Sequence, residues 1–497
     1  MNWLDLFFIP VAIIYLMVVS ALFVYGINFF YLALNAWKKS EALAGPPRTG
    51  LTKLPKVTVQ LPVYNEWYVA TRLIEAAAAL DYPTHLLQIQ VLDDSTDETV
   101  LLIAENVKRL QEGGVNIVHL HRADRRGYKA GALADGLLQA GGEFIAVFDA
   151  DFVPKPDFLQ RILPYFDHER VAFVQARWTH LNREYSLLTF LQSLSIDAHF
   201  AVEQLARAQF GYWFNFNGTA GVWRKEAILD AGGWTAQTLT EDLDLSYRAF
   251  LRGWQARYAA EIEVPAELPV SFSAYRRQQH RWARGSFECA VRFVPLVWQS
   301  DAPLSRKIEA TLHLTGYGVH LLLFALSVLY PIVILISLRY PSLISLFGIA
   351  LLFSFTALAP TTYFVVSQHT LGKRWLLLLP AILFMTVLGA GMMLNTLRAA
   401  LQIWFGHNGV FERTPKYGIV QQKQNWETGR YRSRIDGLVL FELILAVFNL
   451  WTVWLSWRTS NWPIMVYSML FAIGLLFTSG LTLIQYARQR LLSRSQA

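Results

Sequence analysis

Long apolar runs stand at both ends of the chain, with a more polar stretch between them. Residues 7–34 contain no charged side chain, and hydrophobic residues dominate again from residue 313 onward. A helix rises about 1.5 Å per residue and a bilayer core is about 30 Å thick, so the first run can cross a membrane. We therefore predict an N-terminal transmembrane helix within residues 1–36 and a transmembrane bundle within 306–497, with candidate spans at 313–338, 342–367, 375–402, 436–457 and 462–485.

Charged residues beside the first run predict its orientation. Lys38 and Lys39 follow this run, whereas Asp5 precedes it. Cytoplasmic flanks of membrane helices carry an excess of Lys and Arg, so the N-terminus is expected outside and the next segment in the cytoplasm. No basic segment precedes the run and it is too long for a signal-peptide core, which favours a retained helix over a cleaved signal.

Basic residues also predict how many candidate spans cross. With six crossings, the basic tail after residue 485 would lie outside. With five, the tail and the basic loop 403–435 both lie inside, and residues 375–402 form an interfacial or re-entrant helix. Pro380 and Gly389 to Gly391 are candidate breaks within it. We predict five crossings.

The polar stretch at residues 37–305 alternates β-rich runs with helical patterns. The expected strands are 56–61, 87–92, 115–120, 143–148, 170–176 and 257–263, and helical patterns fall at 67–80, 97–112 and 129–140. Strands separated by helices predict an α/β domain with a mixed, mainly parallel sheet. Ligands of such sheets bind beyond the carboxyl ends of the strands.

Composition fits this division. The chain is 54% hydrophobic and 16% charged, against about 25% charged residues in soluble domains. The net charge of +7 suits the cytoplasmic surfaces of a membrane protein, and we expect no nucleic-acid partner. A lone cysteine, Cys289, excludes an intramolecular disulfide framework and is expected to pack as a small apolar residue.

Polar motifs follow the first two expected strands. Tyr64 and Glu66 come after the first strand, and Asp93 and Asp94 after the second. Either motif alone could be a helix cap. Together they favour a nucleoside pocket, because an aromatic ring can stack on a base and a carboxylate can accept from its N–H groups.

Two further motifs suit a diphosphate and a cation. Lys129 lies at the start of a helix, where backbone N–H groups favour anions, although an ordinary basic helix start remains open. Asp149 and Asp151 end the fourth strand and, two residues apart, point the same way. Paired carboxylates beside a phosphate suit Mg²⁺.

The remaining candidate residues suit the transfer of a group to a hydroxyl. Asp242 opens a helix, either as an acid suited to the helix dipole or as the general base that takes a hydroxyl proton. Gln278, Arg281 and Trp282 share a helix face that offers an amide, a guanidinium and an indole, although a membrane-interface helix is the alternative. Thr414 and Lys416 lie in a basic loop that is either a lid or an ordinary cytoplasmic loop.

Taken together, residues 55–420 resemble the membrane-embedded family 2 glycosyltransferases of the cellulose synthase superfamily. Within it they are most similar to the plant cellulose-synthase-like A and C proteins, which make β-1,4-mannan or glucomannan and a β-1,4-glucan. The similarity is carried by the runs VQLPVYNE, QVLDDSTDET, GYKAGAL, FDADFVP, GTAGVWR, EDLDL and AYRRQQHRW. It implies a GT-A catalytic domain with interfacial helices near 187–209 and 285–299.

The resemblance also implies residue roles. Nucleotide binding is expected of Tyr64, Glu66, Asp93, Asp94, Lys129, Asp149, Gln278, Arg281, Thr414 and Lys416. Asp149 and Asp151 would bind Mg²⁺ or Mn²⁺, Asp242 would be the base, and Trp282, Asn217, Gly218 and Thr219 would bind the acceptor. Residues 409–420 would be the gating loop, with Arg413 where cellulose synthases carry Val; Asn217 likewise replaces their Cys.

The predicted function is a processive inverting synthase. It would polymerise a β-linked hexose, such as glucan, mannan or glucomannan, from a UDP- or GDP-sugar at the cytoplasmic face and pass the growing glycan across the bilayer, with accessory secretion subunits as candidate partners. The alternative is a glycolipid synthase that transfers one sugar to ceramide or diacylglycerol. A scaffold or transporter would not need these motifs. A bacterial inner membrane is the default location, and the Golgi is the alternative.

Overall fold

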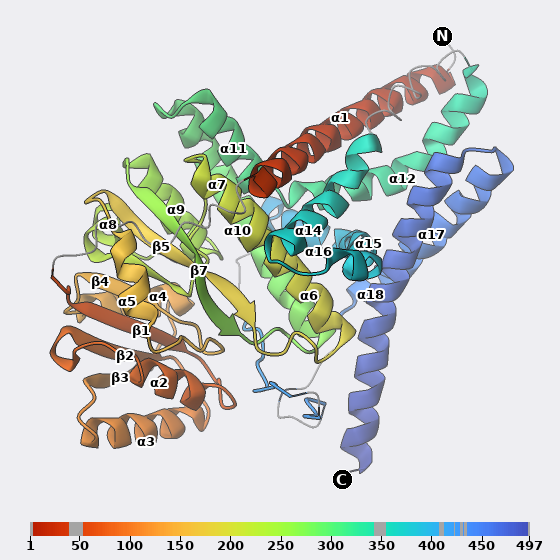
Figure 1. The fold of residues 1–497 in the computed structure, drawn as a ribbon. Coiled ribbons are helices and arrows are strands. Elements are labelled where there is room, and N and C mark those ends of the chain that lie inside the picture. Colours follow the sequence, from red (N-terminus) through yellow and green to blue (C-terminus); the bar gives the residue numbers. More distant parts are fainter. Residues whose placement is uncertain are drawn as a thin grey trace.

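The computed structural model describes residues 3–38, 53–341, 354–406, 412–421, 423–427, 431 and 435–495. An α/β domain lies on one side of the molecule, and long helices from both ends of the chain lie on the other (Figure 1). This division matches the apolar and polar stretches of the sequence. Helix α1 (Trp3–Lys38) extends past the predicted boundary at residue 36. The predicted domain boundaries at 36 and 305 stay predictions.

The domain is built on one seven-stranded sheet of order β3-β2-β1-β4-β6-β5-β7. Neighbours pair in parallel except for β6, which runs antiparallel to β4 and β5. The mixed, mainly parallel GT-A-like sheet is thus confirmed. The strands are β1 (Val57–Val63), β2 (Leu87–Asp93), β3 (Ile117–His121), β4 (Phe144–Val147), β5 (Val171–His180), β6 (Gly221–Arg224) and β7 (Gln255–Ala266).

Sequence patterning predicted six of these strands and missed β6. This strand has only four residues, too few for a periodicity, and it lies between two predicted strands. Strand β5, which pairs with β6, is longer than predicted because its second half is only partly buried and carries polar residues. Strand β7 also extends beyond its predicted bounds at both ends.

Helices cover both faces of the sheet and bury it. The residues of β1 and β2 are nearly all buried, as expected for parallel strands covered on both sides. One apolar cluster contains Val59 and Ile103, and another contains Val147 and Phe173. The covering helices are α2 (Ala70–Ala78), α3 (Thr99–Glu112), α4 (Tyr128–Leu138), α5 (Phe158–Ile162), α8 (Lys225–Asp230) and α9 (Glu241–Leu251).

A second group of helices joins the domain to the apolar bundle. The chain is helical over α6 (Leu187–Ala198), η4 (His199–Gln204) and α7 (Leu205–Gln209), and again over α10 (Phe272–Gln299) and α11 (Leu304–Leu314). These elements cover both segments expected to be interfacial helices. A buried ion pair between Arg276 of α10 and Glu442 of α17 (Leu438–Arg458), 2.9 Å long, ties the domain to the bundle.

Within the described residues, five helical stretches are long and apolar enough to cross a membrane. They are Phe8–Lys38, Gly318–Arg339, Trp375–Trp404, Leu438–Arg458 and Trp462–Leu492. The second is α12 (Gly318–Arg339), which starts five residues later than predicted because α11 ends at Leu314. The last lies in α18 (Trp462–Ser495).

The stretch predicted not to cross is divided in two. Helix α15 (Trp375–Gly391) ends at the predicted break of Gly389 to Gly391, and α16 (Met393–Trp404) follows after Met392. The other candidate break was wrong, because α15 continues through Pro380. Gly391 packs so closely on α18 that a Cβ there would lie 2.5 Å from the Gly474 carbonyl oxygen. Of the predicted span 342–367, residues 342–353 lie outside the described residues, and the rest forms η6 (Ser354–Leu358) and most of α14 (Ala359–Thr370). Which of the two stretches crosses therefore stays a prediction.

Candidate active site

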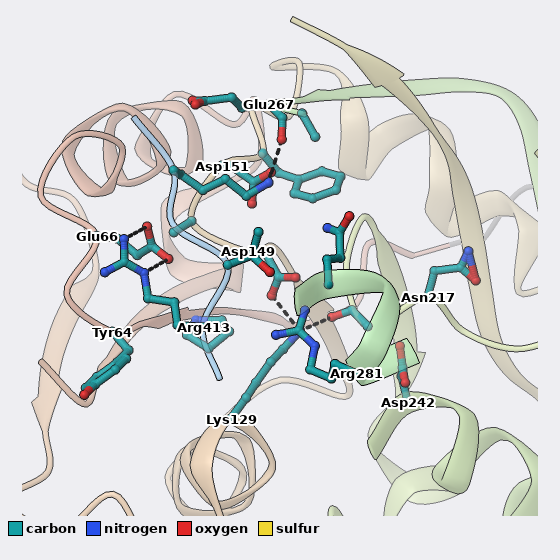
Figure 2. Close-up of a pocket in the computed structure, with 18 of the residues that line it drawn as sticks. Tyr64, Glu66, Lys129, Asp149, Asp151, Asn217, Asp242, Glu267, Arg281 and Arg413 are labelled. Carbon is teal, nitrogen blue, oxygen red and sulfur yellow. Dashed lines mark hydrogen bonds and ion pairs between the residues drawn. The ribbon is translucent and has the colours of Figure 1, made fainter. Parts of the chain in front are cut away.

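One cavity opens at the carboxyl ends of β1, β2 and β4, beneath α10 and residues 412–421 (Figure 2). It gathers residues that lie as much as 354 positions apart in sequence, from Pro62 to Lys416. The predicted residues that line it are Tyr64, Glu66, Asp94, Lys129, Asp149, Asp151, Asn217, Gly218, Asp242, Gln278, Arg281, Trp282, Thr414 and Lys416. Two predicted residues, Asp93 and Thr219, do not line the cavity and lie behind the residues that form its wall.

These two residues support the wall. Thr219 is buried, and its hydroxyl accepts a hydrogen bond of 2.9 Å from the backbone N–H of Asp149. The Asp93 carboxylate is fully buried and turned toward His119 and His121. Burial by itself would raise the pKa of Asp93, but hydrogen bonds from His119 and Ser95 outweigh it and lower the pKa. Direct contact of Asp93 or Thr219 with a ligand therefore stays a prediction.

The end of the cavity near β1 and β2 combines rings and guanidinium groups. The guanidinium carbon of Arg125 lies 3.5 Å from the centre of the Tyr64 ring. Asp94 is held by Arg122 through two contacts of 2.7 Å. A planar guanidinium on an aromatic face marks a surface on which another flat group, such as a base, can stack.

The same end is closed by an ion pair from the loop after α16. Arg413 donates from Nε to Glu66 Oε1 at 3.0 Å and from Nη2 to Glu66 Oε2 at 3.1 Å (Figure 2). It also donates to the Asn65 carbonyl. Burial raises the pKa of Glu66 to about 7, although the Arg413 charge opposes this shift. The predicted loop 409–420 thus reaches the Tyr64 and Glu66 end of the cavity; residues 409–411 lie outside the described residues.

Lys129 lies between the first aspartate of the DxD pair and the start of α9. Its Nζ is 2.6 Å from Asp149 Oδ1 and 3.5 Å from Glu241 Oε1. Burial would lower the pKa of Lys129, but the two carboxylates outweigh it and raise the pKa to about 12. Lys129 therefore stays charged and offers a cation to a phosphate. The pKa of Asp149 is raised by its burial, against the opposing charge of Lys129.

The second aspartate of the pair is held by the loop. Lys416 Nζ lies 2.7 Å from Asp151 Oδ2 and donates to the Glu267 carbonyl at 2.6 Å. The Glu267 carboxylate accepts from the Tyr417 N–H at 2.9 Å, which fixes the loop backbone. Thr414 Oγ1 is buried, and it has no hydrogen-bond partner among the residues that the structure describes. A buried hydroxyl without a partner fits a site where a ligand oxygen or N–H completes the bond.

The DxD pair has the donor set of a hard divalent cation. Both carboxylates line the cavity, and each is at present balanced by a lysine, Lys129 or Lys416. Mg²⁺ and Mn²⁺ prefer oxygen ligands and share them with substrate phosphates. The residues therefore fit such an ion, which would compete with the lysines for the carboxylates.

Asp242 lies at the opposite end of the cavity from Glu66. Burial and the neighbouring Glu241 raise its pKa to about 7, while Lys129 opposes the shift. A pKa near neutrality is what a general base needs, because the group is then deprotonated yet still basic. Gly218 makes room for this arrangement: a Cβ there would lie 2.8 Å from Asp242 Oδ2 and 3.2 Å from Lys129 Nζ.

Helix α10 brings its polar face over Asp242. Gln278, Arg281 and Trp282 all line the cavity, as their spacing predicted. Arg281 Nη1 donates to the Glu412 carbonyl at 3.3 Å, so α10 also touches the loop. Close approach depends on Gly285, where a Cβ would lie 2.4 Å from Thr240 Cγ2. Glu288 accepts a hydrogen bond from the Leu239 N–H, and the Sγ of buried Cys289 contacts the Thr240 hydroxyl. These contacts hold α10 to the start of α9.

Sequence reasoning missed four side chains of this site. Glu241 and Arg413 lay within motifs already noted, but their charge partners are far away in the sequence. Arg125 lies just before the helix that begins with the GYKAGAL run, and nothing in the sequence indicates its contact with Tyr64. Glu267 had no motif around it, and only the fold shows that it holds the loop.

The fold and the site define the GT-A class of glycosyltransferase domain. A scan against protein families matches residues 55–285 to "Glycosyltransferase like family 2". These residues form a family 2 glycosyltransferase domain, and the resemblance drawn from the sequence is confirmed.

Curated proteins similar to this chain include plant enzymes. Glucomannan 4-beta-mannosyltransferase 2 of Arabidopsis thaliana is 45% identical over 260 residues, which cover 50% of this chain and 49% of that protein. The probable glucomannan 4-beta-mannosyltransferase 11 of rice is 49% identical over 236 residues, covering 46% of this chain and 41% of that protein. The chain thus spans about half the length of the curated relatives it matches.

Among solved structures, the Pyrobaculum calidifontis mannosyltransferase PcManGT, in complex with GDP-Man and Mn²⁺, is 18% identical to this chain. The superposition has a TM-score of 0.48 and covers 79% of this chain and 100% of that one.

Proposed function

We propose that this protein is a β-1,4-mannan or glucomannan synthase: an inverting glycosyltransferase that extends a β-linked hexose chain from a nucleotide sugar. The observation that carries the proposal is one cavity that combines the DxD pair, the buried Asp242 carboxyl group, whose pKa is raised to about 7, and the Gln278–Trp282 face. The matched relatives are named as glucomannan 4-beta-mannosyltransferases, which favours mannose as a transferred sugar.

The roles follow from the two ends of the cavity. The nucleoside would bind at the Tyr64 and Glu66 end, and the diphosphate would lie between Lys129 and Arg281, with Thr414 and Lys416 covering it. Mg²⁺ or Mn²⁺ at Asp149 and Asp151 would neutralise charge on the leaving diphosphate.

Asp242 would take the proton from the acceptor hydroxyl. That hydroxyl attacks the anomeric carbon from the face opposite the diphosphate, which inverts its configuration and forms the β-linkage. Trp282 would stack on the terminal sugar of the acceptor, and Asn217 and Gly218 would line its path, supported from behind by buried Thr219. Asn217 already lies in a hydrogen-bonded cluster, accepting from Gln204 at 2.7 Å and donating to His199.

A donor screen tests this proposal directly. Purified full-length protein, reconstituted in lipid, is incubated with GDP-mannose, GDP-glucose or UDP-glucose, and its product is examined by linkage analysis. We expect an ethanol-insoluble polymer that a β-mannanase degrades. A product limited to one sugar on ceramide or diacylglycerol would contradict the proposal and favour the glycolipid synthase.

Processive synthesis further requires the bilayer. We propose that the five crossings predicted from charge placement carry the chain, with residues 375–402 re-entrant and the catalytic domain cytoplasmic. The plant origin of the matched relatives favours a eukaryotic membrane, with the Golgi as candidate, over a bacterial inner membrane. A reporter fused after residue 497 should read cytoplasmic; a lumenal or periplasmic signal would contradict the five crossings. Accessory secretion subunits would appear on mild solubilisation followed by mass spectrometry.

A further inference from the structure

Outside the cavity, two imidazoles and a carboxylate converge at the edge of the sheet. Strand β3 is the edge strand, and its His119 and His121 are two residues apart, so their side chains project from one face. In the parallel register, Asp93 of β2 lies beside His121. Asp93 Oδ2 is 2.9 Å from His119 Nε2 and 3.3 Å from His121 Nδ1. One ligand atom from each residue lies within 4.8 Å of the other two.

This spacing is close to that of a tetrahedral metal site. Ligands at about 2.0–2.1 Å from Zn²⁺ are separated from each other by about 3.4 Å. The 3.3 Å distance from Asp93 to His121 is close to this value, and the 2.9 Å distance to His119 is shorter, so the His119 imidazole would have to move outward to admit the ion. The His121 side chain is 40% exposed, which leaves an entry path and room for a water ligand.

The carboxylate is oriented before any ion arrives. Asp93 Oδ1 accepts from the Ser95 N–H at 2.8 Å, and this bond turns Oδ2 toward the imidazoles. Such a hydrogen bond behind a ligand fixes its direction and strengthens metal binding. The three residues are also held by paired strands rather than by a loop, so little ordering entropy opposes binding.

We propose that Asp93, His119 and His121 form a second metal site, one that takes a transition-metal dication such as Zn²⁺. Two imidazoles and one carboxylate suit Zn²⁺, Ni²⁺ or Co²⁺, whereas the oxygen-only pair Asp149 and Asp151 suits Mg²⁺ or Mn²⁺. The ion would also stiffen the end of β2. Ser95 accepts from the Asn65 N–H at 2.8 Å, next to Tyr64 at the nucleoside end of the cavity.

Zn²⁺ titration of the full-length protein tests this site. The protein is first stripped with a chelator and then titrated in the presence of excess Mg²⁺, which occupies the oxygen site, against a chromophoric zinc chelator. We expect one tight Zn²⁺ per chain, weakened at least about tenfold by His119→Gln or His121→Gln, because each removes one ligand. His85→Gln changes an exposed histidine elsewhere in the domain and should leave binding unchanged.

Co²⁺ provides an independent spectroscopic readout. Bound Co²⁺ should give the intense visible bands of tetrahedral coordination in the wild type and not in His121→Gln. His121 is exposed on an edge strand, so this variant should fold, and its thermal midpoint checks that it does. Equal Zn²⁺ affinity in the wild type and in a His119→Gln/His121→Gln double variant would overturn the proposal, as would failure of the wild type to bind. Neither readout depends on glycosyl transfer.

Discussion

Arg413 and Glu66 form a two-contact ion pair, 3.0 Å and 3.1 Å, that joins residues 347 positions apart. It fastens the loop after α16 to the end of β1 and closes the end of the cavity that Tyr64 lines. Lys416 and Asp151 form a second tie from the same loop, 2.7 Å long. The loop is therefore held over the cavity at both Glu66 and Asp151 by charge pairs that a ligand can replace.

Breaking the ion pair between Arg413 and Glu66 should release the loop. In Arg413→Met or Glu66→Gln, the remaining partner loses its charge partner, and the double variant measures their coupling. We expect a coupling of about 1–3 kcal/mol in the free energy of loop opening, as for groups in direct contact. Hydrogen exchange of residues 412–421 measures this. Equal protection in the wild type and both single variants would show that the pair does not hold the loop.

Replacing the proposed base should remove catalysis and spare binding. Asp242→Asn keeps the shape but cannot take a proton, so we expect turnover to fall by about 10²–10⁴-fold. The affinity for the nucleotide, measured by calorimetry, should change little, because Asp242 lies at the far end of the cavity. Glu226→Gln, which changes an acid in the first turn of α8, is the matched control and should stay active. Turnover by Asp242→Asn within a few-fold of wild type would exclude it as the base.

The pH profile should report the raised pKa of Asp242. A base works only when deprotonated, so kcat/KM should rise with pH and level off above about 7, the pKa of this group. Glu241 contributes to the raised pKa, since its charge disfavours a second carboxylate. In Glu241→Gln this repulsion is absent, so the acidic limb should move to lower pH. An acidic limb at the same pH in Glu241→Gln and in the wild type would show that Glu241 does not raise the pKa of Asp242.

Filling the space at Gly218 should damage the site more than backbone strain alone does. Gly218 and Gly233 have φ values of +77° and +75°, so alanine at either position costs about 1–2 kcal/mol in conformational energy. Only at Gly218 would the new Cβ meet Asp242 and Lys129; at Gly233 no heavy atom lies within 4 Å. We expect similar losses in thermal midpoint for the two variants but a large loss of kcat only for Gly218→Ala. Equal kcat in the two variants would refute the close approach.

The approach of α10 can be tested in the same way. Gly285→Ala would place a Cβ 2.4 Å from Thr240 and push the Gln278–Trp282 face away from the cavity. Gly389→Ala is the control: it is also inside a helix, but with no atom within 4 Å. Alanine favours a helix by about 0.5–1 kcal/mol over glycine. We expect Gly389→Ala to be neutral or stabilising and Gly285→Ala to raise the acceptor KM, measured with an oligosaccharide primer.

The requirement for a divalent ion should depend on the carboxylates of Asp149 and Asp151. Removing divalent ions should abolish transfer, and Mg²⁺ or Mn²⁺ should restore it. Asp151→Asn should raise the ion concentration needed, because an amide is a weaker ligand than a carboxylate. Full activity in excess chelator would contradict metal dependence.

The sequence by itself determined the two regimes of the chain, the parallel strands and the places where polar motifs leave them. It could do so because hydrophobic periodicity and strand-end motifs are local signals. Tyr64, Lys129, Asp149 and Asp242 were all found in this way. The sequence did not reveal β6, whose four residues carry no period.

Only the tertiary structure decided which of these groups face one another. It turned Asp93 away from the cavity toward two histidines, and it brought Arg413 to Glu66 and Lys416 to Asp151. It also showed Gly218 and Gly285 to be contact positions rather than loop or helix glycines. The physical reason is that charge pairing and close packing act between atoms a few ångströms apart, whatever their separation along the chain.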